Sequence, residues 1–119
     1  MRPRTAAAQW SERLREDRRE TLARLAHLND DFTGMVAASA QSNADDEHDP
    51  EGATIAFERS QVSALLDQAH NRLRELEAAE TRLAEGRYGV CESCAEPIAA
   101  ARLKARPIAR TCLRCAAAR

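Results

Sequence analysis

The only four cysteines of this chain form two C-x2-C pairs near its C-terminal end, Cys91 with Cys94 and Cys112 with Cys115, and seventeen residues separate the pairs. Each pair can sit on a tight turn that directs two thiolates at one point, and this spacing is typical of a structural zinc site. Because four sulfur ligands complete a tetrahedral shell, no position is left for a water molecule. The pattern therefore predicts a closed metal site and argues against hydrolytic chemistry at the metal.

Other interpretations of the cysteines are weaker, with one exception. A redox dithiol needs one pair beside a strand-helix pattern, which this sequence lacks. Disulfides suit secreted proteins, but residues 1–9 lack the apolar stretch of a signal peptide. Iron suits four thiolates as well as zinc does, and this alternative stays open. We expect one structural Zn²⁺ in a cytoplasmic protein with reduced thiols.

The composition favours long helices over a sheet. Only four residues are aromatic, 31% are charged, and Ala, Leu, Glu and Arg are abundant. No apolar run approaches the length of a membrane span, so we expect no membrane partner. Residues 86–119 carry seven basic side chains against two acidic ones, a formal +5; since the net charge is −1, residues 1–85 hold −6. The two parts have opposite electrostatic character.

Apolar residues recur at steps of three and four in two long stretches, which predicts two amphipathic helices. The first helix begins between residues 5 and 10 and runs to about residue 40. Its stripe consists of Leu14, Thr21, Leu25, Leu28, Phe32 and Met35, interrupted by Arg18 and widened by Leu22. The second helix runs from about residue 50 to residue 85. Its stripe consists of Ile55, Val62, Leu65, Ala69, Leu76, Ala79 and Leu83, broadened by Leu66 and Leu73.

Residues 41–52 are polar and acidic, and they interrupt the apolar pattern. Asp49 and Pro50 suit a helix N-cap and the first helical position, and Gly86 suits the left-handed residue that closes the second helix. Two helices of about 50 Å joined by a short loop pair most economically in antiparallel fashion. We expect an all-α fold, with an antiparallel coiled-coil hairpin over residues 1–85, an acidic tip loop at about 41–52, and a zinc-finger module over residues 86–119 at the other end of the hairpin.

Residues 83–115 resemble the DksA/TraR family of four-cysteine zinc-finger transcription regulators. The resemblance rests on LAEGRYGVCESC at 83–94, Pro97-Ile98, RLKARP at 102–107 and CLRC at 112–115. It implies a coiled-coil factor, not an enzyme, that binds bacterial RNA polymerase directly. The hairpin would enter the secondary channel of the polymerase and alter initiation through its acidic tip, without sequence-specific DNA binding.

The resemblance also suggests which residues act at the tip. Family members often show Asp-x-x-Asp-x-Ala there, whereas this chain keeps the acidity without the exact pattern. Ungapped counting from Cys91 places His48 at the first acidic position and Glu51 at the second. The candidates are Asp45, Asp46, Asp49, Glu51 and Ala53.

Two further features of the module enter the hypothesis. Ala95 stands where family members commonly have glycine, which predicts a strained turn after Cys94. Four basic residues of the module are candidates for contact with an acidic partner surface, or they balance the charge of the thiolates. These four are Arg102, Lys104, Arg106 and Arg110.

Other function classes remain. The cysteine spacing also occurs in GATA-type fingers, so a DNA-binding zinc finger with a coiled-coil dimerisation arm is the main alternative. A tip that holds a catalytic metal ion would need two close carboxylates, such as Asp45 and Asp46, and we expect no such activity. We expect a monomer, whereas a structural dimer would pair the two stripes between chains.

Overall fold

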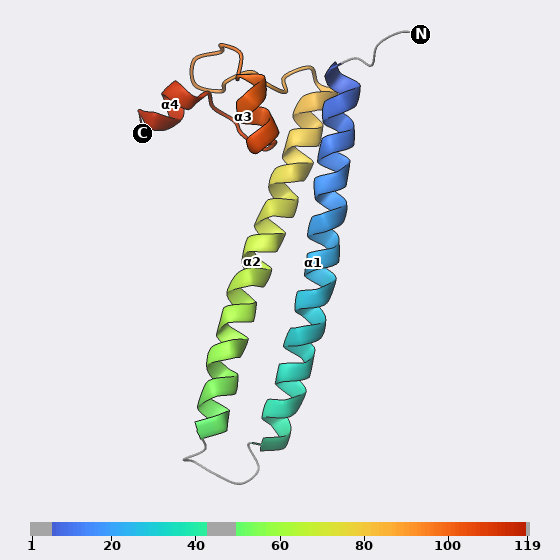
Figure 1. Cartoon of the computed structure of the whole chain (residues 1–119), viewed down its shortest axis with the longest axis vertical. Coiled ribbons are helices and arrows are strands. Elements are labelled where there is room, and N and C mark those ends of the chain that lie inside the picture. Colours follow the sequence, from blue (N-terminus) through green and yellow to red (C-terminus); the bar gives the residue numbers. More distant parts are fainter. Residues whose placement is uncertain (1–5, 43–49, 119) are drawn as a thin grey trace. The chain divides into compact units, whose positions relative to one another are not determined.

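The structure is a computed structural model, and it describes residues 6–42 and 50–118, with the side chains of residues 39–42, 50 and 51 left out (Figure 1). Over these described ranges four helices follow one another: α1 (Ala6–Ser42), α2 (Pro50–Ala84), α3 (Ala100–Ala105) and α4 (Leu113–Ala117). Within the described residues the β-pairing is limited to one isolated bridge between Val90 and Pro97. The predicted all-α fold is therefore confirmed, and α2 begins at the predicted Pro50.

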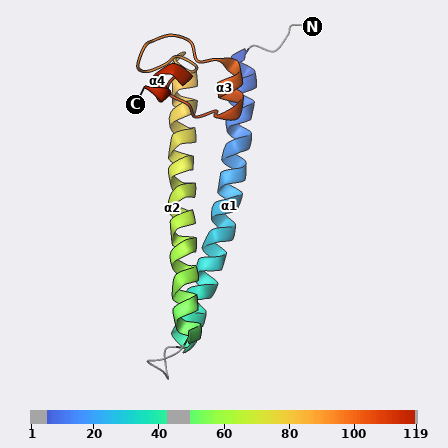
Figure 2. The ribbon, with the colours of Figure 1, turned by 60° about the vertical axis from the view of Figure 1, so that its left-hand side comes forward.

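The two long helices form a hairpin and contribute to two compact units. Unit 1 consists of Met1–Arg19 with Arg74–Arg119, and unit 2 consists of Glu20–Leu73. In each unit a part of α1 lies beside a part of α2 and runs in the opposite direction, as two views show (Figures 1 and 2). No helix in the described ranges combines the length and apolarity needed to cross a bilayer. The division of the chain at residue 85 stays a prediction.

The core of unit 2 follows the predicted stripes, with two corrections. Thr21 and Leu25 of α1 are buried four residues apart, and Val62 and Ala69 of α2 are buried seven residues apart, which is the heptad repeat of a coiled coil. Leu22 and Leu65, however, are 46% and 47% exposed, so their assignment to the stripes was wrong. Each is one residue away from a stripe position, which turns a side chain by about 100° around the helix.

Unit 1 has a separate core at the base of the hairpin. Leu14, Leu76 and Ala79 are fully buried in one cluster, and Leu83, Tyr88 and Ile108 pack against it. Arg18, which interrupts the apolar stripe, lies within ion-pair distance of Glu77 (3.8 Å) and Glu80 (3.6 Å) on α2. At this position charged groups, and not apolar side chains, of the two helices face one another.

The end of α2 is set by Gly86, as predicted. Gly86 adopts a φ of 74°, in the left-handed region. Its N–H donates to the carbonyl oxygen of Leu83 (3.2 Å), and the N–H of Arg87 donates to that of Arg82 (2.8 Å). This pair of bonds is the Schellman motif, which satisfies the last carbonyl groups of a helix. It turns the chain out of α2 and into the cysteine-containing module.

Candidate zinc centre

The four cysteines meet at one point. Their Sγ atoms all lie within 4.8 Å of one another, and Cys94 Sγ is 3.8 Å from Cys112 Sγ. Tetrahedral zinc with Zn–S bonds of about 2.3 Å separates its sulfurs by about 3.8 Å, so the donor set and its spacing fit zinc. Cys91 is buried and the other three are half-buried. The four cysteines thus provide the site for one structural Zn²⁺.

Backbone hydrogen bonds shape the two turns that carry the thiols. In the first turn, the Cys91 N–H donates to the Glu96 carbonyl oxygen (2.8 Å), and the Ala95 N–H donates to that of Cys91 (2.9 Å). In the second, α4 begins directly after Cys112 and carries Cys115 in its first turn. The Glu92 N–H donates to the Arg110 carbonyl oxygen (2.8 Å), which ties the two turns together.

The thiols influence one another's protonation. Hydrogen bonds, first of all from the backbone of Cys112, lower the pKa of Cys91 to about 6. The pKa of Cys115 is raised to about 12, because hydrogen bonds with Cys112, Cys94 and Cys91 hold its proton. Four sulfurs this close cannot all ionise unless a cation neutralises them. Zinc supplies that charge, which is why metal binding to such a site releases protons.

The turn after Cys94 is strained, as predicted for Ala95. Ala95 has a φ of 64°, and it is the one non-glycine residue with a positive φ in the described ranges. This left-handed conformation costs an L-residue about 1–2 kcal/mol, because Cβ approaches the following carbonyl oxygen. The strain lies inside the first metal-binding turn.

We therefore expect Ala95→Gly to raise the free energy of unfolding of the zinc-loaded protein by about 0.5–1 kcal/mol. Relief of the left-handed strain outweighs the greater freedom of glycine in the unfolded chain, about 0.4–1 kcal/mol. Urea unfolding checks the value. Ala64→Gly, at an exposed helical position of α2, is the control and should lose about 1 kcal/mol. A loss in both variants would contradict the strain at Ala95.

Aromatic and apolar contacts fix the module within unit 1. Buried Cys91, Ile98 and Leu103 form a cluster, and partly buried Trp10 and Tyr88 pack against it. The Trp10 and Tyr88 rings lie 5.7 Å apart at an interplanar angle of 48°. The Tyr88 hydroxyl donates to the Pro107 carbonyl oxygen (2.8 Å). The start of α1 thereby supports the metal site, a role that the sequence analysis missed.

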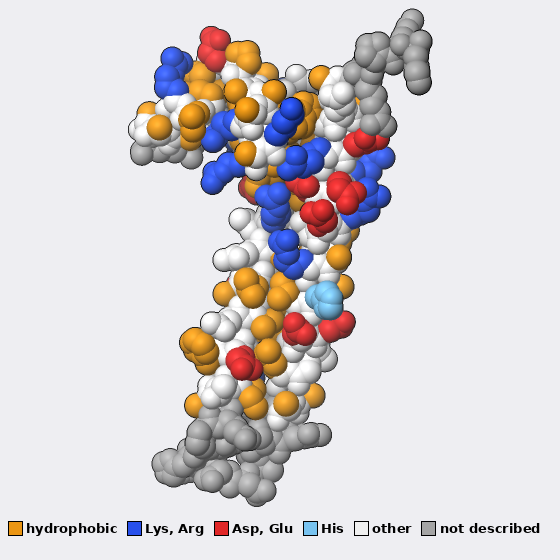
Figure 3. Space-filling view, in the orientation of Figure 1, with side chains coloured by type: hydrophobic (Ala, Val, Ile, Leu, Met, Phe, Trp, Pro, Cys, Tyr) orange, Lys and Arg blue, Asp and Glu red, His pale blue; other side chains and the backbone are white. Residues whose placement is uncertain are grey.

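The predicted basic residues divide into two kinds. Arg102 donates from Nε to the Thr111 carbonyl oxygen (2.9 Å) beside the second cysteine turn. Arg110 lies between Glu75 of α2 (3.2 Å) and Glu92 of the first turn (3.3 Å). Lys104 and Arg106 are exposed. Figure 3 shows Lys and Arg side chains gathered on this face of unit 1.

Arg82 is a buried cation that the sequence analysis did not identify. It is 5% exposed, and neither terminal nitrogen has a hydrogen-bond partner among the described residues. Burial, followed by the charge of Arg110, lowers its pKa, whereas Glu92 and Glu75 act in the opposite direction. A buried guanidinium whose two terminal nitrogens lack hydrogen bonds is costly, so Arg82 is a site of local instability.

Arg82→Met should raise the free energy of unfolding by about 1 kcal/mol, since an apolar side chain of similar length removes the desolvated charge. Chemical denaturation of the zinc-loaded protein measures this. Arg87→Met is the matched control: Arg87 is exposed and pairs with Glu85, and exposed pairs contribute little. A large loss in Arg82→Met alone would show instead that Glu75 and Glu92 stabilise the buried charge.

The tip candidates mostly lie outside the described residues. Asp45, Asp46 and Asp49 fall in the gap between α1 and α2, and the side chain of Glu51 is not described. Ala53 is exposed on the first turn of α2. Their roles stay predictions.

Comparison with known proteins gives concordant matches. Residues 86–119 match the model of the prokaryotic dksA/traR C4-type zinc finger. The chain is 28% identical over 109 residues to the RNA polymerase-binding transcription factor DksA of Haemophilus influenzae, covering 89% of this chain and 63% of that protein. It is 29% identical over 100 residues to DksA of Caulobacter vibrioides, covering 84% and 61%.

A shorter match and a solved structure complete the comparison. An uncharacterized protein of Aquifex aeolicus is 43% identical over 56 residues, which cover 44% of this chain and 39% of that protein. The chain thus spans about two to three fifths of the length of these relatives. The structure of transcription factor DksA2 from Pseudomonas aeruginosa superimposes with a TM-score of 0.79 at 25% identity, covering 98% of this chain and 89% of that one. With the cysteine geometry, these matches identify residues 86–119 as a zinc finger of the prokaryotic dksA/traR C4 type, in a chain that is similar to DksA proteins over most of its length.

Proposed function

We propose that this chain is a cytoplasmic transcription regulator that binds bacterial RNA polymerase directly and inserts its helical hairpin into the secondary channel. The observation that carries the proposal is the similarity to DksA2 over 98% of the chain, which includes both long helices and the cysteine module. The relatives named RNA polymerase-binding transcription factors support it. In this proposal the chain acts as a monomer and catalyses no reaction.

In this proposal the zinc module, the long helices and the acidic segment have different roles. The zinc site and the cluster around Tyr88 hold the module rigidly against the base of the hairpin. The long helices, of 37 and 35 residues, carry the acidic segment between them. Asp45, Asp46, Asp49 and Glu51 would bring negative charge close to the catalytic centre of the polymerase, where it would alter initiation.

The first experiment is binding of the zinc-loaded protein to RNA polymerase core enzyme, with free promoter DNA as a parallel target. We expect binding to the enzyme without DNA. Binding to DNA alone, with a steep loss of affinity as salt rises, would overturn the proposal in favour of a DNA-binding zinc finger.

A second experiment separates docking from effect. Asp49→Asn with Glu51→Gln should keep the fold and polymerase binding but weaken the change in transcript yield from a responsive promoter. The control is Glu58→Gln with Asp67→Asn, which removes two exposed carboxylates elsewhere on α2. Equal effects of the two double variants would contradict a specific role for the tip.

A further inference from the structure

A groove lies on the cysteine module, between α3, α4 and the loop that follows Cys94. Its volume is about 710 Å³, within the range of ligand-binding clefts. Alanines of α3, Pro97 and Leu113 give it an apolar lining. Leu113 is 70% exposed, the largest exposed fraction among the exposed large hydrophobic residues. The groove thus combines a hollow surface with an apolar side chain that nothing in the described structure covers.

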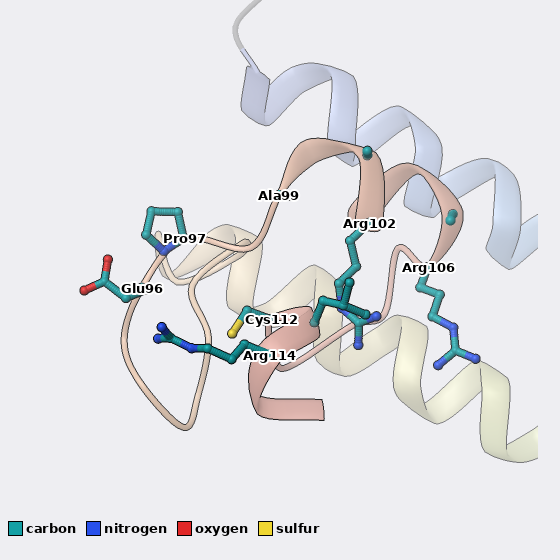
Figure 4. Close-up of a pocket in the computed structure, with 10 residues that line it drawn as sticks. Glu96, Pro97, Ala99, Arg102, Arg106, Cys112 and Arg114 are labelled. Atoms are coloured by element: carbon teal, nitrogen blue, oxygen red, sulfur yellow. The ribbon is translucent and has the colours of Figure 1, made fainter. Parts of the chain in front are cut away.

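Three arginines border this apolar surface. Arg102 of α3 and Arg106, which directly follows α3, lie on one side, and Arg114 extends from α4 toward the loop of Glu96 and Pro97 (Figure 4). Arg102 is held through its Nε by Thr111. The guanidinium groups of Arg106 and Arg114 make no ion pair with any other described residue. Because Glu96 is the only acidic residue of the lining, the groove has an excess of positive charge.

We propose that this groove binds an acidic amphipathic helix of a partner protein. One or two leucine-like side chains would pack on Leu113 and the α3 alanines, and carboxylates on either side would pair with Arg106 and Arg114. This is the helix-in-groove mode, in which apolar anchors recur at steps of three and four. A nucleic-acid backbone carries negative charge that could pair with the arginines, but it has no apolar side chains to pack on Leu113 and the α3 alanines. A protein helix therefore fits the groove better. The inference is independent of polymerase binding, because it rests on the groove alone.

The test uses the full-length, zinc-loaded protein and a fluorescein-labelled helical peptide of about fifteen residues, with leucines at steps of three and four and glutamates between them. Fluorescence anisotropy measures its affinity. Arg106→Ala with Arg114→Ala should weaken binding about five- to tenfold, since each exposed ion pair contributes up to about fivefold. Leu113→Ala should also weaken binding. Lys104→Ala is the matched control, because Lys104 is an exposed cation of α3 outside the groove lining.

The outcomes are distinguishable. The inference is supported if the groove variants lose affinity, the Lys104 variant does not, and a peptide with glutamine for glutamate binds at least fivefold more weakly. No binding by the wild-type protein, or an equal loss in the Lys104 variant, overturns it. Equal binding of a peptide in which leucines are replaced by glutamines also overturns it, because the surface would then bind charge alone. Zinc content is measured for every variant, so that loss of the module is not mistaken for loss of the groove.

Discussion

Loss of zinc is expected to unfold the cysteine module while most of α1 and α2 stay helical. Structural zinc contributes about 10–16 kcal/mol in small modules at neutral pH. The module has only Cys91, Ile98 and Leu103 in its buried cluster, and a core of that size cannot replace this contribution. Cys112→Ser removes one of four ligands and should have the same consequence as a strong chelator.

The only tryptophan of the chain reports on this change. Trp10 belongs to α1 but packs against the module and lies beside Tyr88, so unfolding of the module should expose it to water and shift its emission to longer wavelength. Circular dichroism at the same time should lose only the signal of α3 and α4. Ser93→Ala, inside the first cysteine turn but not a ligand, is the control and should leave both signals unchanged. A Cys112→Ser protein with full zinc content and unshifted emission would show that the ligand set is wrong.

The helices were predictable because their signals are local. The steps of three and four, the proline at the start of α2 and the glycine after its end all act within a few residues of the boundary that they set. Leu65 shows the limit of that information. Leu65 and Leu66 lie three and four residues after Val62, so either could continue its apolar stripe, and only the packing against α1 decides between them.

In the metal site, too, the features that depend on local sequence were predictable and those that depend on distant contacts were not. The cysteine spacing predicted the metal centre, and the resemblance to a family that commonly has glycine at position 95 pointed to strain at Ala95, because both depend on short segments. The charged residues were ambiguous. The sequence analysis offered Arg110 as a candidate for contact with a partner or for balancing the thiolates. In the structure it pairs with Glu75, thirty-five residues earlier. No local sequence signal marks Arg82 as buried, yet it is 5% exposed. Such outcomes depend on which surfaces meet, which no local pattern contains.

The core at the hairpin base leads to the second large effect. Leu14→Ala is expected to lower the free energy of unfolding by about 2–5 kcal/mol, because Leu14 is fully buried and its removal leaves a cavity next to Leu76 and Ala79. Urea unfolding of the zinc-loaded protein measures the loss. Since Leu83, Tyr88 and Ile108 pack against the same cluster, the loss should appear in Trp10 emission as well as in helicity.

Leu22→Ala is the matched control on the same helix. Leu22 is 46% exposed, so its truncation removes the same atoms with little cavity, and the cost should stay below about 1 kcal/mol. Leu14→Ala combined with Leu76→Ala should cost less than the sum of the two single losses, because the two cavities merge within one cluster. Equal losses for Leu14→Ala and Leu22→Ala would contradict the burial of Leu14, and strict additivity would contradict a shared cavity between α1 and α2.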